Sequence, residues 1–529
     1  MQFAATTINL ASILEQHARI APAKEAIVCN DVRISYGRLN SLANEVANAL
    51  VDMGIVHGDK IALVCPNLPF FPIIYYGILK VGAVVVPLNV LFKQRDFIYH
   101  LKDSDAKAVF VFEGTDTLPL AQTVKDAFDA TDACEHLIVI TNSPTAPSPF
   151  ENCRTLSEIT VDEPDKFEDF PTKADDTCAI LYTSGTTGQP KGAELTHLNV
   201  FLNAIASNGI HLPFSNSATS RQQVCLITVP LFHSTGQTVQ MNANIYAGNR
   251  VVLLSRFEPQ ATLEIMEKEK VNFWLGVPTM YWAILKYIED TNFDVKKIAR
   301  HLKVPISGGA PMPVEVSKRF SEIFGMPILE GYGLSETSPL AFFDHHEKPS
   351  KAGSVGQAIF GVQAKCMDEN DLEVRFGEFG EIVLRGHNVM KGYYKRPDET
   401  ADALRNGWFH TGDIGYMDEE GYLTIVDRKK DMILRGGYNV YPRELEEVIM
   451  THQAVSLVAV IGVPDERLGE EVKAFIVLKQ GVKLRSDEFI CWCKAQFAAN
   501  KYPRYVEFCD RLPISSTGKI LRRSLRKAN

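Results

Sequence analysis

The chain has 529 residues, of which 46% are hydrophobic and 22% charged, a composition typical of a folded enzyme with more than one domain. Its net charge of −9 and pI near 5.9 show no basic excess, so we expect no nucleic-acid partner. The ten cysteines are scattered without the spacing of a zinc site. The first twenty residues have no basic segment before an apolar core, so we expect no secretory signal and a cytoplasmic location.

The first part of the chain predicts alternating strands and helices. Residues 25–35 contain two apolar runs around Asn30-Asp31 and predict a hairpin, and apolar residues recur at helical spacing over 39–50. The most apolar window, 70–88, is interrupted by a lysine, a glycine and a proline, so it predicts a buried helix and a strand and not a membrane span. Further strands are predicted at 60–64, 83–88 and 108–112. This alternation favours a mainly parallel sheet with helices on both faces.

The composition and residue pattern change twice in the second part of the chain. Glycine-rich strands and turns between about 352 and 423 predict a small β subdomain. From 431 onward we expect a separate α+β domain, with helices at 442–450 and 486–500 and strands at 455–462 and 472–479. The charged run 427–431 predicts a linker. The predicted fold class is therefore α/β: a large N-terminal domain of mainly parallel sheets flanked by helices (1–427), a hinge (428–430) and a small mobile α+β C-terminal domain (431–529).

A loop rich in glycine and hydroxyl groups occupies residues 181–192, with the sequence LYTSGTTGQPKG. Glycines let backbone N–H groups approach an anion, hydroxyls donate to its oxygens, and a lysine adds positive charge. The loop differs from a P-loop because Pro190 precedes the lysine and Gly192 follows it. On its own such a loop is more often a plain surface turn. The residues predicted to hold phosphate are Thr183, Ser184, Gly185, Thr186, Thr187, Gly188 and Lys191.

Four further stretches add nucleotide chemistry. Residues 330–337, EGYGLSET, suit base stacking and an oxygen-ligated Mg²⁺. Asp413 in WFHTGDIG could accept both ribose hydroxyls or cap a turn, and Arg428 could pair with ribose, phosphate or a surface carboxylate. Lys519 lies on the polar turn LPISSTGKI, where an isolated lysine is usually a solvated charge.

In this order and at these separations, the motifs resemble the adenylate-forming superfamily of acyl-CoA synthetases, luciferases and peptide-synthetase adenylation domains, over nearly the whole chain. The sequence is most similar to the medium- and long-chain fatty acyl-CoA ligases, in the motifs YTSGTTGQPKGAELTH, PLFHSTGQ, SGGAPMP, GYGLSET, GWFHTGD, VDRKKDMILRGGYNVYPRELE and PISSTGKILRR. The resemblance implies two steps. A carboxylate attacks the α-phosphate of Mg·ATP to give acyl-AMP and pyrophosphate, and the thiol of CoA then takes the acyl group.

The resemblance also implies roles for individual residues. Thr183 and Glu336 would bind Mg²⁺, Lys191 and the loop would hold the β- and γ-phosphates, and Lys519 would bridge the α-phosphate and the attacking carboxylate. His233 joins the catalytic candidates, with a satisfied loop histidine as the alternative. The other residues assigned to nucleotide or thiol binding are Gly309, Ala310, Pro311, Glu330, Gly331, Tyr332, Gly333, Thr337, Asp413, Arg428, Lys430, Gly436, Gly437 and Tyr438.

Lys430 matches the hinge position of the family. We expect rotation about Lys430 to withdraw Lys519 after the first step and to bring residues 435–438 toward the tunnel of the thiol.

The acyl pocket is expected to be lined by residues 231–241 and 274–282 and by the loops at Gly308 and Gly333. Its flanking residues are apolar: Phe232, Val239, Met241, Val277 and Met280. Residues 231–245 contain no arginine or lysine to neutralise a second carboxylate, which disfavours a dicarboxylic acid. Leu434 and Arg435 stand where plant-type coumarate ligases carry basic residues, which lowers the case for a hydroxycinnamate. We therefore expect an aliphatic monocarboxylic acid of medium or long chain.

Three functional hypotheses remain open from the sequence. The first is a fatty acyl-CoA synthetase, and CoA is favoured because no large-domain insertion typical of fatty acyl-AMP ligases is evident. The second is an acyl-AMP ligase that loads the phosphopantetheine thiol of an acyl carrier protein. The third is a catalytically silent ligand-binding relative, which the presence of Lys519, Glu336 and Asp413 disfavours. The expected ligands are a small carboxylic acid, ATP, Mg²⁺ and CoA, with at most peripheral membrane contact.

Overall fold

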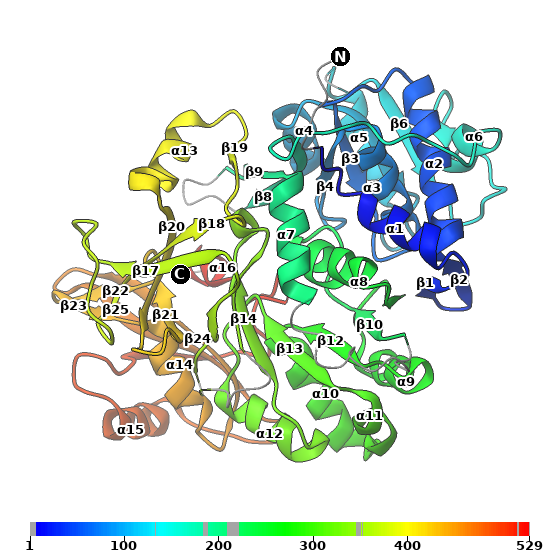
Figure 1. Cartoon of the computed structure of the whole chain (residues 1–529). Coiled ribbons are helices and arrows are strands. Elements are labelled where there is room, and N and C mark those ends of the chain that lie inside the picture. Colours follow the sequence, from blue (N-terminus) through cyan, green and yellow to red (C-terminus); the bar gives the residue numbers. More distant parts are fainter. Residues whose placement is uncertain are drawn as a thin grey trace.

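The computed structural model describes residues 7–132, 134–183, 189–208, 222–344, 351, 353–515 and 518–527 (Figure 1). Four sheets organise these residues, with nine, eight, four and five strands. The first three belong to the large N-terminal part, and the fourth to the C-terminal part. The predicted α/β class, with a large part of mainly parallel sheets and a small α+β part, is confirmed.

The eight-stranded sheet has the order β19-β9-β8-β4-β3-β5-β6-β7. Its strands are β3 (Lys60–Val64), β4 (Val84–Pro87), β5 (Ala106–Phe112), β6 (His136–Ile140), β7 (Arg154–Thr155), β8 (Thr177–Thr183), β9 (Lys191–Thr196) and β19 (Gly392–Tyr393). Strands β3 to β8 pair in parallel, and β9 and β19 close one edge in antiparallel pairings. The accompanying helices are α2 (Tyr36–Asp52), α3 (Phe70–Lys80), α4 (Gln94–Asp103), α5 (Leu120–Asp129) and α6 (Leu156–Thr160). The glycine- and hydroxyl-rich stretch 181–192, called the phosphate loop from here on, therefore runs from the end of β8 to the start of the adjacent strand β9.

The nine-stranded sheet has the order β16-β15-β14-β13-β12-β10-β11-β1-β2. Its strands are β1 (Glu25–Cys29), β2 (Val32–Ser35), β10 (Val224–Ile227), β11 (Arg250–Leu253), β12 (Phe273–Gly276), β13 (Val304–Gly308), β14 (Leu329–Gly333), β15 (Leu340–Phe343) and β16 (Gln357–Ala358). Its helices are α1 (Ser12–Ile20), α7 (His197–Asn208), a π-helix (Thr235–Asn242), α8 (Ala243–Tyr246), α9 (Pro259–Glu269), α10 (Pro278–Thr291), α11 (Lys296–His301) and α12 (Val314–Phe324). The predicted hairpin at 25–35 is confirmed as β1–β2.

The remaining sheets form the β subdomain and the C-terminal part. The antiparallel sheet β17-β18-β20-β21 consists of Val362–Met367, Gly380–Gly386, Phe409–Met417 and Leu423–Arg428, with α13 (Pro397–Ala403) beside it. The C-terminal part contains β22 (Ile433–Arg435), β23 (Tyr438–Val440), α14 (Pro442–Met450), β24 (Val455–Asp465), β25 (Gly469–Leu478), α15 (Ser486–Gln496), β26 (Tyr505–Phe508) and α16 (Arg522–Lys527). The red C-terminal end of the chain runs back to the middle of the molecule (Figure 1).

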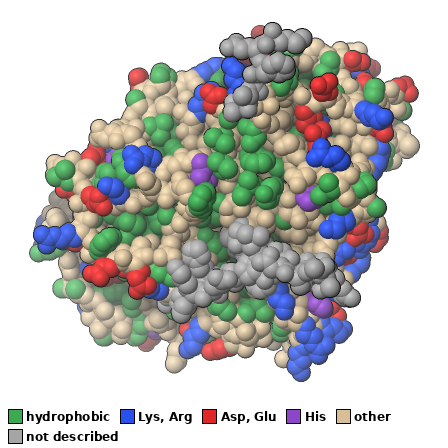
Figure 2. Space-filling view, viewed as in Figure 1, with side chains coloured by type: hydrophobic (Ala, Val, Ile, Leu, Met, Phe, Trp, Pro, Cys, Tyr) green, Lys and Arg blue, Asp and Glu red, His purple; other side chains and the backbone are tan. Residues whose placement is uncertain are grey.

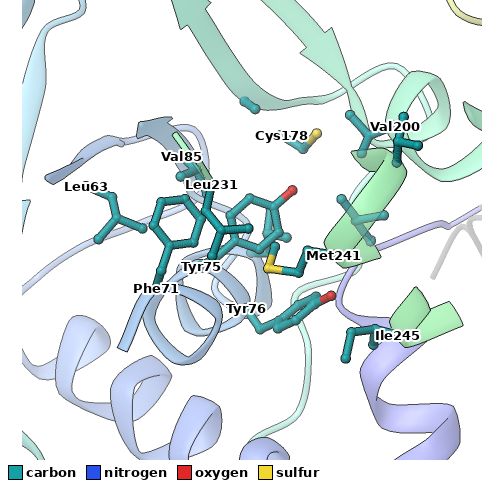
Figure 3. Packing of buried hydrophobic residues seen from close by; sticks show 14 of the residues in the cluster. Leu63, Phe71, Tyr75, Tyr76, Val85, Cys178, Val200, Leu231, Met241 and Ile245 are labelled. Atoms are coloured by element: carbon teal, nitrogen blue, oxygen red, sulfur yellow. The ribbon is translucent and has the colours of Figure 1, made fainter. Parts of the chain in front are cut away.

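The largest core includes the contact between α3 and the segment that follows β10. Phe71, Tyr75 and Tyr76 are fully buried, and they lie around Leu231 and Met241 (Figure 3). The amide of Asn242 on the π-helix donates to the hydroxyl of Tyr75 (3.1 Å) and accepts from that of Tyr76 (2.8 Å). This packing fixes one end of the segment predicted to line the acyl pocket.

The outer surface carries both signs of charge. Basic and acidic side chains are interspersed around the rim of the face in Figure 2, and hydrophobic side chains gather near its middle. Within the described residues, no helix combines the length and apolar character needed to cross a membrane.

Candidate functional site

A carboxylate and two hydroxyl groups form the first part of the site. Glu336 lies on a short 3-10 helix (Ser335–Thr337) after β14, and its side chain is largely buried. Thr183, the last residue of β8, donates to Glu336 Oε1 at 3.1 Å, and the hydroxyl of Tyr393 donates to the same oxygen at 3.0 Å. Both predicted metal ligands, Thr183 and Glu336, are thus brought together by strands from two different sheets.

Lys191 opens β9 directly opposite Thr183 in the β8–β9 ladder. Its ammonium nitrogen lies 5.1 Å from the centroid of the Tyr393 ring, a distance typical of a cation–π contact. Five of the seven loop residues between these strand ends, Ser184, Gly185, Thr186, Thr187 and Gly188, lie outside the described residues. The two ends of the phosphate loop therefore stand beside Glu336.

Asp413 is the centre of a second cluster. Its Oδ2 accepts from the Tyr332 hydroxyl at 2.6 Å, and its Oδ1 lies 3.1 Å from Nε of Arg428. Asp413 and Arg428 are partners across the β20–β21 ladder, which fixes their separation. The charge of Asp413 raises the pKa of Arg428, and burial followed by that same charge raises the pKa of Tyr332. A buried carboxylate held by a phenol and a guanidinium suits the recognition of ribose hydroxyls.

Lys519 reaches this cluster from the C-terminal part. The carbonyl of Gly518 accepts from Thr279 Oγ1 at 3.1 Å, and Lys519 Cε lies 3.5 Å from the Cβ position of Gly309. Gly518 has φ of +78°, and a Cβ there would come within 2.5 Å of Val277 Cγ2, so a side chain would displace the lysine turn. The structure therefore joins the two parts of the chain at the site.

The charge of Lys519 is set by its neighbours. Burial and the positive charge of Arg428 lower the pKa of Lys519 to about 8, although Asp413 and Glu336 oppose this shift. Burial and Lys519 together lower the pKa of His233 to about 3, so this imidazole is neutral at physiological pH. The N–H of Thr235 approaches His233 Nδ1 at 3.3 Å. His233 thus lies close enough to Lys519 for the lysine charge to lower the pKa of the imidazole.

The loops after β13 and β14 hold the remaining nucleotide candidates. Gly309 and Pro311 are exposed at the carboxyl end of β13, with Ala310 between them. Thr337 is fully buried, and its hydroxyl contacts the carbonyls of Leu334 and Pro339 and accepts from the Leu334 N–H, so it shapes its own loop. A Cβ at Gly333 would lie 1.7 Å from the Pro339 carbonyl oxygen, which excludes any side chain there.

Glu330 and Gly331 lie on β14, opposite residues 343 and 344. Gly331 packs against the Phe343 ring. Burial raises the pKa of Glu330 to about 7, against the opposing charge of Arg443 from α14. Glu330 is thus a second point where the C-terminal part influences the large part.

The residues assigned to the thiol lie elsewhere. Gly436 and Gly437 form the turn between β22 and β23, and Tyr438 is 62% exposed. Arg435, just before them, is buried in an ion pair of 2.5 Å with Glu471. Lys430 follows β21, and burial and Arg428 lower its pKa. In this arrangement Lys519, and not the 435–438 turn, reaches the cluster around Asp413.

The expected acyl-pocket residues, which we call the apolar wall, are buried in two separate packing clusters. Leu231, Val239 and Met241 are buried beside α3, and Val277 and Met280 are buried at the start of α10. Trp274 donates to Thr228 Oγ1 at 3.0 Å and packs on Tyr281 with ring centroids 4.5 Å apart. Of these residues, Val277 lies next to the lysine turn, since its Cγ2 would be 2.5 Å from a Cβ at Gly518.

Sequence reasoning missed Tyr393, and it included Thr279 only as part of the 274–282 acyl-pocket range and not as a partner of the lysine turn. Tyr393 belongs to the run KGYYKRP, where two tyrosines next to a glycine are the available signal. That run forms a two-residue strand, which has too few residues to show a period, and its partners Glu336 and Lys191 are far away in sequence.

The chain is similar to known proteins over nearly its whole length. The AMP-binding enzyme family matches residues 14–394, and the AMP-binding enzyme C-terminal domain matches residues 444–519. A long-chain-fatty-acid–CoA ligase of Bacillus subtilis (strain 168) is 36% identical, covering 98% of this chain and 94% of that protein. A feruloyl-CoA synthase of Amycolatopsis sp is 35% identical over 97% of each chain. The crystal structure of ATP-bound MatB from Rhodopseudomonas palustris has a TM-score of 0.88 at 30% identity and covers 99% of both chains.

The chain therefore belongs to the AMP-binding enzymes, and within them to the adenylate-forming acyl-CoA ligases. These are acid–thiol ligases, and ATP and CoA are consistent with this membership.

Proposed function

We propose that this enzyme activates a medium- or long-chain fatty acid as acyl-AMP and transfers the acyl group to CoA. The observation that carries the first step is the convergence of Lys519 with the clusters of Glu336 and Asp413. The carboxylate of the acid attacks the α-phosphorus of ATP, and the bond to the bridging oxygen breaks to release pyrophosphate. The CoA thiolate then attacks the acyl carbon, and AMP leaves.

The chain's own groups supply positive charge and donors where the phosphates crowd together. Lys191 would neutralise the β- and γ-phosphates, and Lys519 would hold the α-phosphate and the attacking carboxylate in one place. With a pKa near 8, Lys519 is mostly charged at neutral pH. Asp413 and Arg428 would orient the ribose, and the neutral His233 would stand at the entrance of the acyl wall.

The donor set beside the phosphate loop fits Mg²⁺. Glu336 uses Oε1 for its two hydroxyl donors, and Oε2 has no hydrogen-bond partner among the described residues. One free carboxylate oxygen and one nearby hydroxyl, completed by phosphate oxygens and water, are the ligands that Mg²⁺ usually takes. When bound, the ion would neutralise phosphate charge during the displacement.

The apolar wall and the Bacillus subtilis relative support a fatty acid as the substrate. The 35% identical feruloyl-CoA synthase supports an aromatic acid as a second candidate. CoA is the proposed acceptor, a carrier-protein thiol is its alternative, and we place the reaction in the cytoplasm. A catalytically silent relative is disfavoured by the charged groups gathered around Lys519.

Pyrophosphate release tests this proposal directly. Purified protein is given Mg·ATP and saturated acids from acetate to palmitate, with ferulate alongside, in the presence of either CoA or a holo acyl carrier protein. We expect turnover with CoA that rises from acetate to the longer acids. Turnover only with the carrier protein, preference for ferulate, or no release with any acid would each contradict the proposal, in its acceptor, its substrate or its chemistry.

A further inference from the structure

Tyr393 contacts both charged groups at the base of the phosphate loop. Its hydroxyl donates to Glu336 Oε1 at 3.0 Å, and its ring lies under the ammonium of Lys191 at 5.1 Å. Glu336 and Lys191 have opposite charges, and each is expected to act on a different part of Mg·ATP. A single side chain therefore touches the carboxylate and the cation at once.

The backbone holds Tyr393 firmly in this position. Strand β19 pairs with β9, so Tyr393 lies opposite Ala193, two residues after Lys191. Its N–H donates to Thr400 Oγ1 at 2.9 Å, and the N–H of Tyr394 donates to the carbonyl of Gly192 at 2.8 Å. The ring itself packs against the large hydrophobic core. The position of the hydroxyl is therefore set by the sheet and does not depend on a bound nucleotide.

The hydrogen bond has a defined direction. An ionised carboxylate can only accept a hydrogen bond, so the Tyr393 hydroxyl is the donor and Glu336 the acceptor. Together with the Thr183 hydroxyl, it occupies Glu336 Oε1. Glu336 Oε2 has no hydrogen-bond partner among the residues that the structure describes, so the two donors fix which oxygen is available to a cation.

We propose that Tyr393 is a positioning residue for nucleotide binding: its hydroxyl orients Glu336 toward the divalent cation of Mg·ATP, and its ring holds Lys191 at the phosphates. This inference rests on the proposed function, because it assumes that ATP binds here with Mg²⁺. The proposal gives the hydroxyl and the ring of Tyr393 two separate effects on ATP binding. The hydroxyl acts on the metal-dependent part of binding, and the ring acts on the metal-independent part.

The test measures ATP binding by calorimetry without acid or CoA, in Mg²⁺ and in EDTA. Tyr393→Phe removes the hydroxyl and keeps the ring, and we expect Mg·ATP to bind about tenfold more weakly, the size expected for losing a hydrogen bond to a charged group. Metal-free ATP should bind as in the wild type. Tyr393→Leu removes the ring as well and should weaken metal-free ATP also.

The adjacent Tyr394 provides a matched control. Its hydroxyl also donates to a carboxylate, Asp105 at 2.8 Å, but that carboxylate lies outside the site. Tyr394→Phe should leave both affinities unchanged. Unchanged Mg·ATP affinity in Tyr393→Phe overturns the inference, and so does an equal loss in Mg²⁺ and in EDTA.

A double-mutant cycle excludes a merely structural effect. In a Glu336→Gln background, the loss caused by Tyr393→Phe should disappear, because the oriented carboxylate is gone. A loss of the same size in that background would contradict the inference. A wild-type protein that binds no ATP would instead contradict the proposed function, so the two failures are distinguishable.

Discussion

At the scale of single residues, the site is dominated by positive charge that is only partly compensated. Arg428 lowers the pKa of Lys519 and also that of Lys430, while Asp413 and Glu336 oppose the shift of Lys519. Such a cluster is costly in the empty protein, because like charges repel. An incoming triphosphate would relieve this repulsion, so the repulsion present in the empty site favours nucleotide binding.

The pH dependence of adenylation should follow Lys519. The protonated lysine would be the active form in the proposed reaction, and its pKa of about 8 lies below the usual value, so charge is lost as pH rises through 8. We expect kcat/KM for ATP, measured by pyrophosphate release, to fall about tenfold between pH 7 and 9. In Lys519→Arg, which stays charged over this range, activity should be lower but the alkaline fall should vanish. A fall that persists in Lys519→Arg would assign it to another group.

At the scale of elements, the sequence predicted the helices and strands whose residue pattern is contained in one short stretch of the chain. The window 70–88 was predicted as a buried helix and a strand, and α3 and β4 confirm it. Strand β13 continues to Gly308, because its ladder with β14 extends into the polar residues at the carboxyl edge. Strand β26 was missed, since its half-exposed residues show little apolar contrast. Among the site residues, Thr183 and Glu336 belong to recognisable sequence motifs. Tyr393 could not be predicted in this way, because its place in the site depends on contacts with residues distant in sequence.

Helix α3 contains a buried charge whose cost can be measured. Lys80 is fully buried and pairs with Glu15 at 2.7 Å and with Asp169 at 2.9 Å. Removing one partner of such a group leaves an uncompensated charge and costs about 3–5 kcal/mol. Lys80→Met should therefore lower the melting temperature clearly. Lys125→Met, which breaks a pair with the exposed Asp129, should cost less than about 1 kcal/mol.

The pH dependence of the Lys80→Met defect identifies its cause. Burial raises the pKa of Asp169 to about 6 even beside Lys80. A raised folded pKa means that the folded state binds the proton more tightly, so the stability contributed by Asp169 falls as pH rises from about 4 through 6. Without Lys80 this pKa should rise further. The melting temperature of Lys80→Met should therefore be closer to that of the wild type at pH 5 than at pH 7.5, and a defect independent of pH would indicate lost packing instead.

At the scale of the whole molecule, the structure has the domain arrangement that suits the first half-reaction. Thr279 binds the Gly518 carbonyl, and Arg443 on α14 donates to the Ile425 carbonyl and, through its backbone N–H, to Asp427. Arg522 on α16 lies near Asp427 and Asp431 on either side of the hinge. These contacts hold Lys519 beside Asp413 and Arg428, while residues 436–438 remain exposed. The second half-reaction would then require them to break.

Replacing Lys430 with proline tests whether one residue allows that change. The N–H of Lys430 donates no backbone hydrogen bond among the described residues, so a proline there should leave the present arrangement intact while fixing φ. We expect Lys430→Pro to form acyl-AMP, measured as pyrophosphate exchange, within about threefold of the wild type, and to transfer supplied acyl-AMP to CoA at least about a hundredfold more slowly. Lys430→Ala, which removes the charge but keeps the backbone free, should perform both steps. If the proline variant lost both half-reactions equally, rotation about Lys430 would not be the event that separates them.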